Sequence, residues 1–351
     1  FEAIADLSDR VLLDDHARTH EGRRLIHAIV THPDNHKNLE NLRIENVKIS
    51  EMPNQMTNKN LDKMPLVAYL GFSIHGDEAS GTEDAILLLH HLAAGQGDEI
   101  DEILKNTILI VDPMFNPDGR DRFANWANGN RGVVPTTDTQ DREHNQPWPR
   151  GRTNHYLFDL NRDWMPVTQP ESQGRVKLFH HWRPQFLLDA HEMGNNSTFF
   201  FQPGIKSRTN PNTPKEGIDL AYRLAPFFAK RLDDIQSMYY SEQSYDDFYY
   251  GKGSTYGDIH GSVGILFEQA SSRALETDSN QGRLTYAFTV RNHFMSTIGA
   301  LDGLVSLRKY FLRYQRDFYA SSSAVATKNK TKGYLINLKQ NRTRAQMLIK
   351  T

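Results

Sequence analysis

Two histidines and one glutamate in this chain have the residue types and spacing of a hydrolytic metal site. His75 and Glu78 stand three residues apart, and His191 follows more than a hundred residues later. Catalytic zinc is typically held by three protein ligands that leave one position open for water, and two histidines with one carboxylate are a standard set. These three side chains are therefore the predicted ligands of one zinc ion per chain.

Apolar runs before the two histidines predict strands that bring them to one edge of a sheet. Residues 65–71 and 186–190 are rich in strand-forming residues, and residues 81–94 read as a helix. Ligands of open α/β sheets bind beyond the carboxyl ends of the strands, so two strand ends would supply one site. The first histidine and the glutamate can converge on one ion if Gly76 lets the chain turn.

A His-x-x-Glu pair alone is weak support, because the chain has 15 histidines among 351 residues and short motifs match by chance. Three further blocks follow it: Asn-Pro-Asp-Gly at 116–119, Phe-Asp-Leu-Asn-Arg-Asp-Trp at 158–164 and Gly-Ile-Leu-Phe-Glu at 264–268. In this order, the blocks and the predicted ligands resemble the M14 family of zinc carboxypeptidases over about residues 65–295. The resemblance implies an α/β fold, with a mixed, mostly parallel eight-stranded sheet and helices on both faces. It also implies zinc-dependent hydrolysis of the C-terminal peptide bond of peptides.

The pair Asn161 and Arg162 offers an amide beside a planar guanidinium, which suits bidentate capture of a carboxylate such as a free C-terminus. A surface salt bridge is the commoner fate of an arginine, but the apolar residues around this pair favour a partly buried edge. By the resemblance, the pair anchors the terminal carboxylate of the substrate, and Asp159 accepts the second N–H of the first zinc histidine. Asp189 either plays a related part beside His191 or caps its strand.

Glu268 ends an apolar run. Glutamates at strand ends are usually solvated and inert, but the resemblance makes this one the general base that takes a proton from water at the zinc and passes it to the leaving amine. A further arginine is expected upstream of the Asn-Arg pair to polarise the scissile carbonyl. Arg152 and Arg150 are the candidates, and Arg131 and Arg142 stay open.

Residues 246–256 are rich in glycine and tyrosine, a composition expected of a mobile binding loop. The family has a tyrosine here that closes over the substrate, whereas the aligned position in this chain is Phe248. The candidates for that tyrosine are Tyr250 and Tyr249, with Tyr256 more distant. Thr255 stands where a residue influences specificity in the family, and its lack of charge disfavours a strict preference for charged C-terminal side chains.

The composition limits the possible partners. Lysine plus arginine number 41 and aspartate plus glutamate 43, so the net charge of −2 provides no field to gather nucleic acid or an anionic membrane. No apolar run is long enough to span a membrane. The absence of cysteine excludes disulfides and thiolate ligands. The predicted partners are the C-termini of peptides or proteins, and the sequence does not indicate the oligomeric state.

The alternation of strand and helix patterns predicts one catalytic α/β domain over residues 1–318. Residues 1–45 read as a polar helical cover, and residues 116–155 as a loop that walls the cleft. Further helices are predicted near residues 169–182, 215–238 and 287–315. Further strands are predicted near residues 44–50, 107–112, 198–202 and 263–268.

Residues 319–351 read as a linker and the start of a truncated second domain, with one strand at 333–338, in agreement with the resemblance to longer bacterial members of the family. The chain begins at Phe1 without methionine or a signal peptide, which suggests a processed start. The absence of cysteine fits a secreted bacterial protein, and the resemblance to the family is the main reason that a periplasmic or extracellular location is expected.

Two other functions fit part of the pattern. A zinc amidase or deacylase of N-acyl amino acids, similar to the aspartoacylase-like branch, shares the first metal pair and the Asn-Arg block. The ligand spacing and the Asn-Pro-Asp-Gly block favour the peptidase. The other alternative is a non-catalytic zinc-containing module that binds peptides, and the presence of Glu268 counts against it.

Overall fold

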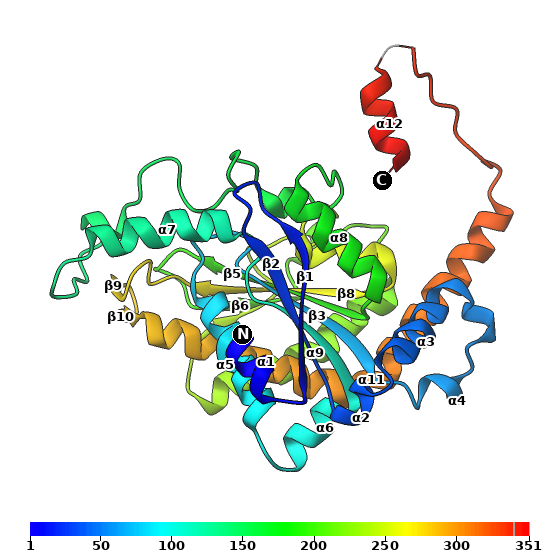
Figure 1. Cartoon of the computed structure of the whole chain (residues 1–351), viewed down its shortest axis with the longest axis horizontal. Helices are drawn as coiled ribbons and strands as arrows, with labels where there is room; N and C mark the ends of the chain where they lie inside the picture. The colour runs from blue at the N-terminus through cyan, green and yellow to red at the C-terminus, as the bar shows by residue number, and fades with distance from the viewer. Residues whose placement is uncertain (340, 351) are drawn as a thin grey trace.

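The computed structural model describes residues 1–339 and 341–350, and it centres on one eight-stranded sheet (Figure 1). The strand order is β1-β2-β4-β3-β5-β8-β6-β7. The strands are β1 (Val11–Arg18), β2 (Arg24–Val30), β3 (Leu66–Phe72), β4 (Thr107–Asp112), β5 (Phe186–Met193), β6 (Phe199–Phe201), β7 (Tyr239–Tyr240) and β8 (Val263–Ala270). The four central strands, β4, β3, β5 and β8, run parallel, whereas β1, β2 and β6 make antiparallel pairs. The predicted α/β fold with a mixed, mostly parallel sheet is confirmed.

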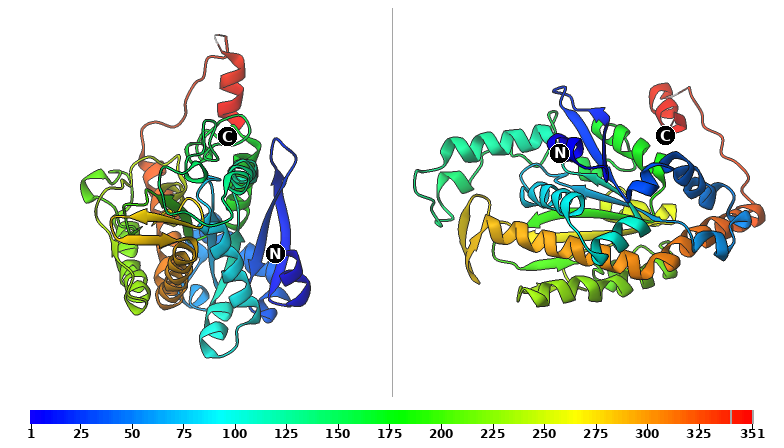
Figure 2. Two further views of the ribbon diagram at one scale, coloured as in Figure 1. Left: turned by 90° about the vertical axis from the view of Figure 1, so that its left-hand side faces the viewer. Right: turned by 60° about the horizontal axis from the view of Figure 1, so that its bottom comes forward.

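Helices cover both faces of this sheet (Figure 2). They are α1 (Glu2–Leu7), α2 (Pro33–His36), α3 (Leu39–Glu51), α4 (Asn58–Leu61), α5 (Ser80–Ala94), α6 (Asp98–Asn106), α7 (Pro117–Asn130), α8 (Pro170–Trp182), α9 (Lys215–Asp234), α10 (Gly253–Tyr256), α11 (Tyr286–Lys328) and α12 (Arg342–Lys350). One core lies between the sheet and helices α5, α6, α9 and α11, and a second lies between the sheet and α8. A small two-stranded sheet of β9 (Glu276–Ser279) and β10 (Gly282–Thr285) lies beside the main one.

Strand alternation decides which side chains reach the α8 face of the sheet. Leu188 and Ala190 of β5 belong to the core on the α11 side. Successive side chains of a strand point to opposite faces, so Asp189 and His191 lie on the α8 side. In β8, Phe267 packs in the α11-side core, and Glu268 therefore shares the face of His191, with which it is paired in register.

The prediction of a helical cover over residues 1–45 is wrong for residues 11–30, whereas α1, α2 and the first part of α3 are helical. Residues 11–30 contain the hairpin β1-β2, which extends the sheet beyond β4 with antiparallel strands. The alternating pattern is hard to recognise because the edge strand β1 carries polar residues at 14–16.

The predicted strand at 44–50 is also wrong, since these residues belong to α3. Leu39 and Leu42 pack against the α8-side core, and Asn46 and Ile49 are buried. This spacing of three and four residues is the period of a helix.

The predicted loop over residues 116–155 contains a helix in its first part. Helix α7 begins after Asn116, whose side-chain oxygen accepts a hydrogen bond from the Gly119 amide at 3.0 Å. Pro117 occupies the first helical position, where its missing N–H costs nothing. The Asn-Pro pair therefore marks a helix start as well as a turn.

Helix α11 continues past the predicted end near residue 315 to Lys328, and no strand forms at 333–338. The buried residues of α11 end at Gln315, and residues 321–328 are exposed, so no tertiary packing marks the end of this helix. Helix α12 is drawn apart from the sheet and its covering helices (Figure 1). The proposed domain division at residue 318 stays a prediction. Within the described part of the chain, no helix has the length and apolar character needed to cross a membrane.

A buried aspartate in α5 predicts a pH-dependent loss of stability. Burial raises the pKa of Asp84 to about 8, although its carboxyl group accepts a hydrogen bond from the Thr297 hydroxyl at 2.8 Å. Because the unfolded carboxyl titrates near 3.8, the folded state holds a proton that the unfolded state lacks between about pH 4 and pH 8. The free energy of unfolding should therefore fall as pH rises, by up to about 1.4 kcal/mol per pH unit.

Asp84→Asn removes this titration and keeps the shape of the side chain. Urea unfolding at pH 5 and pH 8 should show the variant gaining stability relative to the wild type as the pH rises. An identical pH slope in both proteins would contradict the assignment.

Candidate metal and catalytic site

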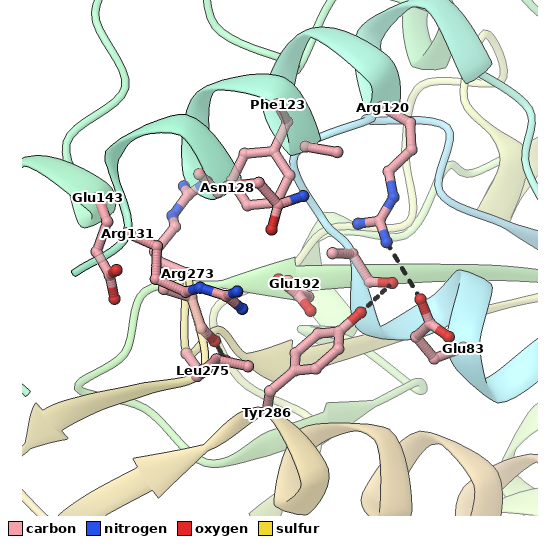
Figure 3. Close-up of a pocket in the computed structure, with 15 residues that line it drawn as sticks. Glu83, Arg120, Phe123, Asn128, Arg131, Glu143, Glu192, Arg273, Leu275 and Tyr286 are labelled. Atoms are coloured by element: carbon pink, nitrogen blue, oxygen red, sulfur yellow. Dashed lines mark hydrogen bonds and ion pairs between the residues drawn. The ribbon is translucent and has the colours of Figure 1, made fainter. Parts of the chain in front are cut away.

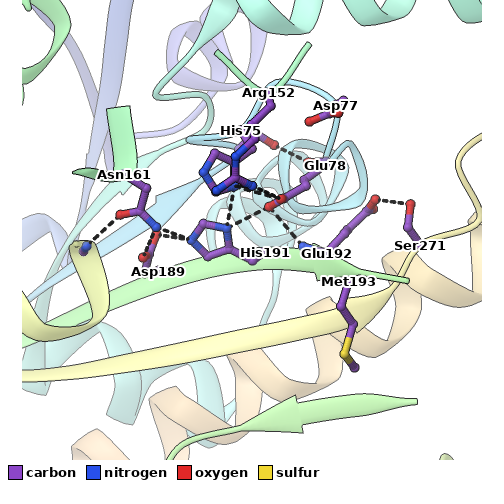
Figure 4. Close-up of polar contacts among 12 residues, drawn as sticks. His75, Asp77, Glu78, Arg152, Asn161, Asp189, His191, Glu192, Met193 and Ser271 are labelled. Carbon is purple, nitrogen blue, oxygen red and sulfur yellow. Dashed lines mark hydrogen bonds and ion pairs between the residues drawn. The ribbon is translucent and has the colours of Figure 1, made fainter. Parts of the chain in front are cut away.

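His75, Glu78 and His191 converge at the carboxyl ends of β3 and β5 (Figure 4). Their ligand atoms all lie within 4.8 Å of one another, and all three residues are buried. The Nδ1 atoms of His75 and His191 are 2.8 and 2.7 Å from the two carboxylate oxygens of Glu78 and 3.2 Å from each other. Two imidazoles and a carboxylate directed at one point are a donor set that fits a zinc ion.

The turn that carries the first two ligands depends on a glycine. The Glu78 amide donates to the His75 carbonyl at 3.1 Å, which closes a turn just before α5. A Cβ at Gly76 would lie 2.1 Å from the backbone nitrogen of Arg120 in α7. Only glycine lets the ligand turn pack this closely against α7.

Each histidine has a carboxylate at its other ring nitrogen. Asp159 Oδ1 lies 3.1 Å from Nε2 of His75, and Asp189 Oδ1 lies 2.8 Å from Nε2 of His191. Such partners fix the N–H on Nε2 and leave the Nδ1 lone pair directed at the metal position. The structure therefore places Asp189 beside His191, where the sequence left open a strand-capping role.

The charges of the cluster reinforce one another. Burial lowers the pKa of His191, but the carboxylates of Asp189 and Glu78 outweigh this effect and hold the pKa well above its usual value. Burial likewise raises the pKa of Glu78, and the two imidazoles outweigh it and hold the pKa well below its usual value. These interactions therefore favour the ionised carboxylate of Glu78 beside a positively charged group.

The turn at residues 160–162 presents Asn161 and Arg162 differently. Asn161 is buried; its Nδ2 lies 3.0 Å from Asp189 Oδ2, and its Oδ1 accepts from the Gly253 amide at 2.8 Å. Arg162 is exposed, and its side chain donates to the Asn161 carbonyl at 2.7 Å. The guanidinium is therefore the accessible half of this pair.

Of the candidate arginines, the structure brings Arg152 to the ligands. Its guanidinium donates to Asp159 Oδ2 at 2.9 and 3.2 Å and lies 3.2 Å from His75 Nδ1. Arg150 is exposed, and its backbone carbonyl accepts a hydrogen bond from the Arg122 guanidinium at 2.8 Å. The guanidinium of Arg142 lies over the ring of Trp126 in α7.

Glu268 enters the site from β8, opposite His191 in the parallel register. Desolvation in this enclosed position raises the pKa of Glu268 to about 8, against the opposing effect of His191. Burial and, to a lesser extent, the charge of Glu268 raise the pKa of the phenol of Tyr245, a residue that the sequence analysis did not single out. The Tyr245 hydroxyl lies 3.3 Å from Met193 Sδ at the end of β5.

The tyrosine-rich loop places its residues in distinct surroundings. The hydroxyl of Tyr249, a half-exposed residue, lies 3.4 Å from the Arg162 carbonyl, and that of Tyr250 lies 3.1 Å from Thr213 Oγ1. Tyr256 is part of the α8-side core. Thr255 is buried, and its hydroxyl donates to the Tyr249 carbonyl. Among the predicted tyrosines, Tyr249 is therefore the one for which the described residues show a contact with the Asn161-Arg162 pair.

Arg175 of α8 contacts the turn at residues 160–162, and the sequence analysis did not single it out. Its guanidinium is buried over the rings of Trp164 and Phe115, at 4.2 and 5.0 Å from their centroids. It donates to the Leu160 carbonyl at 3.2 Å, directly before Asn161. No motif signals this role, because a lone arginine in an amphipathic helix reads as a surface residue.

Comparison with known proteins agrees with this geometry. The family model described as zinc carboxypeptidase (Peptidase M14) matches residues 2–292. A probable carboxypeptidase 2 of Trichophyton verrucosum (strain HKI 0517) is 26% identical over 141 residues, which are 40% of this chain and 22% of that protein. Carboxypeptidase 2 of Trichophyton rubrum is 25% identical over 141 residues, 40% of this chain and 21% of that protein. The alignments thus span about a fifth of the length of these curated relatives.

Solved structures share the fold. A metallo-carboxypeptidase from Burkholderia cenocepacia superposes with a TM-score of 0.60 at 15% identity, covering 87% of this chain and 67% of that one. A metallo-carboxypeptidase from Pseudomonas aeruginosa, in complex with (2-guanidinoethylmercapto)succinic acid, gives a TM-score of 0.56 at 16% identity, with coverages of 88% and 68%.

Proposed function

Because the chain belongs to the zinc carboxypeptidase family M14, we propose that it uses one zinc ion to hydrolyse the last peptide bond of peptides or proteins that have a free C-terminal carboxylate. The observation that carries this proposal is the convergence of His75, Glu78 and His191, with Glu268 opposite His191 in the sheet. Nδ1 of each histidine and the Glu78 carboxylate would hold the ion. When bound, zinc would polarise the scissile carbonyl and make water more acidic.

The protein side chains perform the remaining steps. The exposed Arg162 guanidinium captures the terminal carboxylate of the substrate with paired hydrogen bonds and thereby orients the last peptide bond. Arg152 lies beside His75 and stabilises the negative charge that develops on the carbonyl oxygen. Glu268 accepts a proton from the attacking water, and the new C–O bond forms at the carbonyl carbon. As the C–N bond breaks, Glu268 returns this proton to the leaving amine.

Metal removal provides the direct test. Dialysis of the purified chain against a zinc chelator should abolish release of the C-terminal residue from an N-blocked dipeptide, and added zinc should restore it. His191→Gln removes one ligand and should lower both zinc content and activity at least about a hundredfold. The exposed His90 on α5 gives the matched control His90→Gln, which should retain both.

Activity that persists in metal-free protein would contradict this mechanism. An N-acyl amino acid assayed in parallel separates the peptidase from a zinc deacylase, because a deacylase would prefer that substrate. Binding of zinc and peptide without turnover would indicate a non-catalytic module.

A further inference from the structure

A cavity of about 140 Å³ lies beside the metal ligands, between α7, the start of β9 and the first turns of α5 and α11 (Figure 3). Two residues of its wall directly follow metal ligands in the sequence. Ala79 follows the ligand Glu78, and Glu192 follows the ligand His191. Arg273 stands a few residues beyond Glu268 on the segment that leaves β8.

The cavity and the carboxylate anchor lie on opposite sides of the metal ligands along β5. Asp189 is on the anchor side, since it accepts hydrogen bonds from Asn161 and from the Ser254 amide. Glu192 is on the cavity side. At about 3.3 Å per residue, the strand spans about 10 Å between these two positions. A peptide whose terminal carboxylate binds Arg162 therefore extends its upstream residues toward the cavity.

Two arginines of the cavity wall are accessible. Arg131 is exposed, and within residues 1–339 and 341–350 its side chain makes no hydrogen bond or ion pair. The Arg273 side chain is 38% exposed and lies 3.2 Å from Asp77 Oδ2. Figure 3 shows its guanidinium reaching into the cavity. Arg273 also has a φ of 58°, a left-handed conformation that non-glycine residues rarely adopt and that clusters at functional positions.

The carboxylates of the cavity wall are enclosed or already paired. Glu192 is buried, and it accepts hydrogen bonds from the Ser80 amide and hydroxyl and from the Ser271 hydroxyl. Glu83 pairs with Arg120 at 3.3 Å. Glu143 is 1% exposed and lies 3.6 Å from His144 Nε2. Of the accessible charged groups, Glu83 is 39% exposed but already paired with Arg120, whereas the Arg131 guanidinium is left to pair with a ligand.

We propose that this cavity binds the carboxylate of an aspartate or glutamate side chain that lies upstream of the scissile bond, through Arg273 and Arg131. The inference rests on the proposed carboxypeptidase function, because it uses the direction in which a bound peptide would run. Guanidinium groups recognise carboxylates with short, charge-assisted hydrogen bonds. The enzyme would thus select peptides that carry a negative side chain near their C-terminus.

Peptides of alanine with a C-terminal phenylalanine test this selection. Glutamate, glutamine or lysine is placed in turn at each of the three positions before the scissile bond, and kcat/KM is measured for the full chain. At one position, kcat/KM for the glutamate peptide should exceed that for the glutamine peptide about tenfold, mainly through a lower KM. Added salt should reduce this ratio. Arg273→Gln should bring the ratio near one, and Arg131→Glu should shift the preference toward lysine.

The ratio within each variant is the readout, so a general loss of activity does not imitate the effect. Arg24→Gln, at an exposed arginine of the β1-β2 hairpin, should keep the wild-type ratio. Equal rates with glutamate, glutamine and lysine, or a preference of the wild type for lysine, would overturn the inference and leave the proposed function intact. Release of phenylalanine from none of the peptides would overturn both.

Discussion

Replacing Glu268 by glutamine is expected to lower kcat about a thousandfold and to leave the zinc content unchanged. The amide has nearly the same shape as the carboxyl group but cannot accept a proton from water, and general base catalysis contributes about 10² to 10⁴ in rate. Glu268 is not one of the three converging ligand residues, so its loss should not release the ion. Metal analysis and steady-state kinetics on one N-blocked dipeptide measure the two effects separately.

The pH profile gives an independent readout of the same residue. Desolvation raises the pKa of Glu268 to about 8, whereas the neighbouring imidazoles lower it, as a bound zinc ion would. The group works as a base only when it is deprotonated, so activity should fall as the pH drops through its pKa. Glu268→Gln should lose this acidic limb. Glu102→Gln, at an exposed glutamate of α6, should keep both the rate and the limb.

A Glu268→Gln protein with near-normal kcat would show that another group takes the proton. Tyr245 would then be the first to examine, because the charge of Glu268 affects the pKa of its phenol. Its raised pKa keeps the phenol protonated at neutral pH, so it is suited to donate a hydrogen bond rather than to act as the base.

The convergence of the three candidate metal ligands could be predicted from the sequence because local chain geometry helps to fix it. His75 and Glu78 sit on one tight turn, and His191 is carried by a buried strand that neighbours the strand before that turn. Parallel strands bring their carboxyl ends to one edge of the sheet, so the predicted strands, together with the motif order that resembles the family, indicated that the three side chains would meet. Predicted and observed positions agree where the residues depend on this regular core.

The prediction failed where tertiary context decides the structure. Strand β1 has one exposed face and polar side chains, and its pairing with β2 at the edge of the sheet supplies the order that its sequence does not show. The proximity of Arg131 and Arg273 in the cavity could not be predicted either, because they come from segments more than a hundred residues apart. Asp84 and Arg175 are buried ionisable residues, whose burial no local pattern indicates.

Replacing Arg162 by methionine is expected to lower kcat/KM about ten- to a hundredfold for substrates with a free C-terminal carboxylate. Hydrogen bonds between charged groups contribute about 1.5 to 3 kcal/mol, and each 1.4 kcal/mol is a factor of ten. Peptides with a C-terminal amide lack the partner charge, so their low rates should change little. Arg162→Lys should lie between the two, because it keeps the charge but loses the planar fork.

Asn161 should respond differently from its neighbour, and this contrast tests the division of labour within the pair. The amide of Asn161 lies 3.0 Å from Asp189 Oδ2 and 2.9 Å from His191 Nε2, so Asn161→Ala should weaken zinc binding as well as substrate binding. Arg162 is exposed, and within residues 1–339 and 341–350 its side chain forms no hydrogen bond or ion pair with the metal ligands, so its variants should keep their zinc. A zinc titration of both variants beside the kinetic assay distinguishes the roles. Equal loss of zinc affinity in the two variants would contradict this division, in which Arg162 binds the substrate and Asn161 supports the zinc ligands.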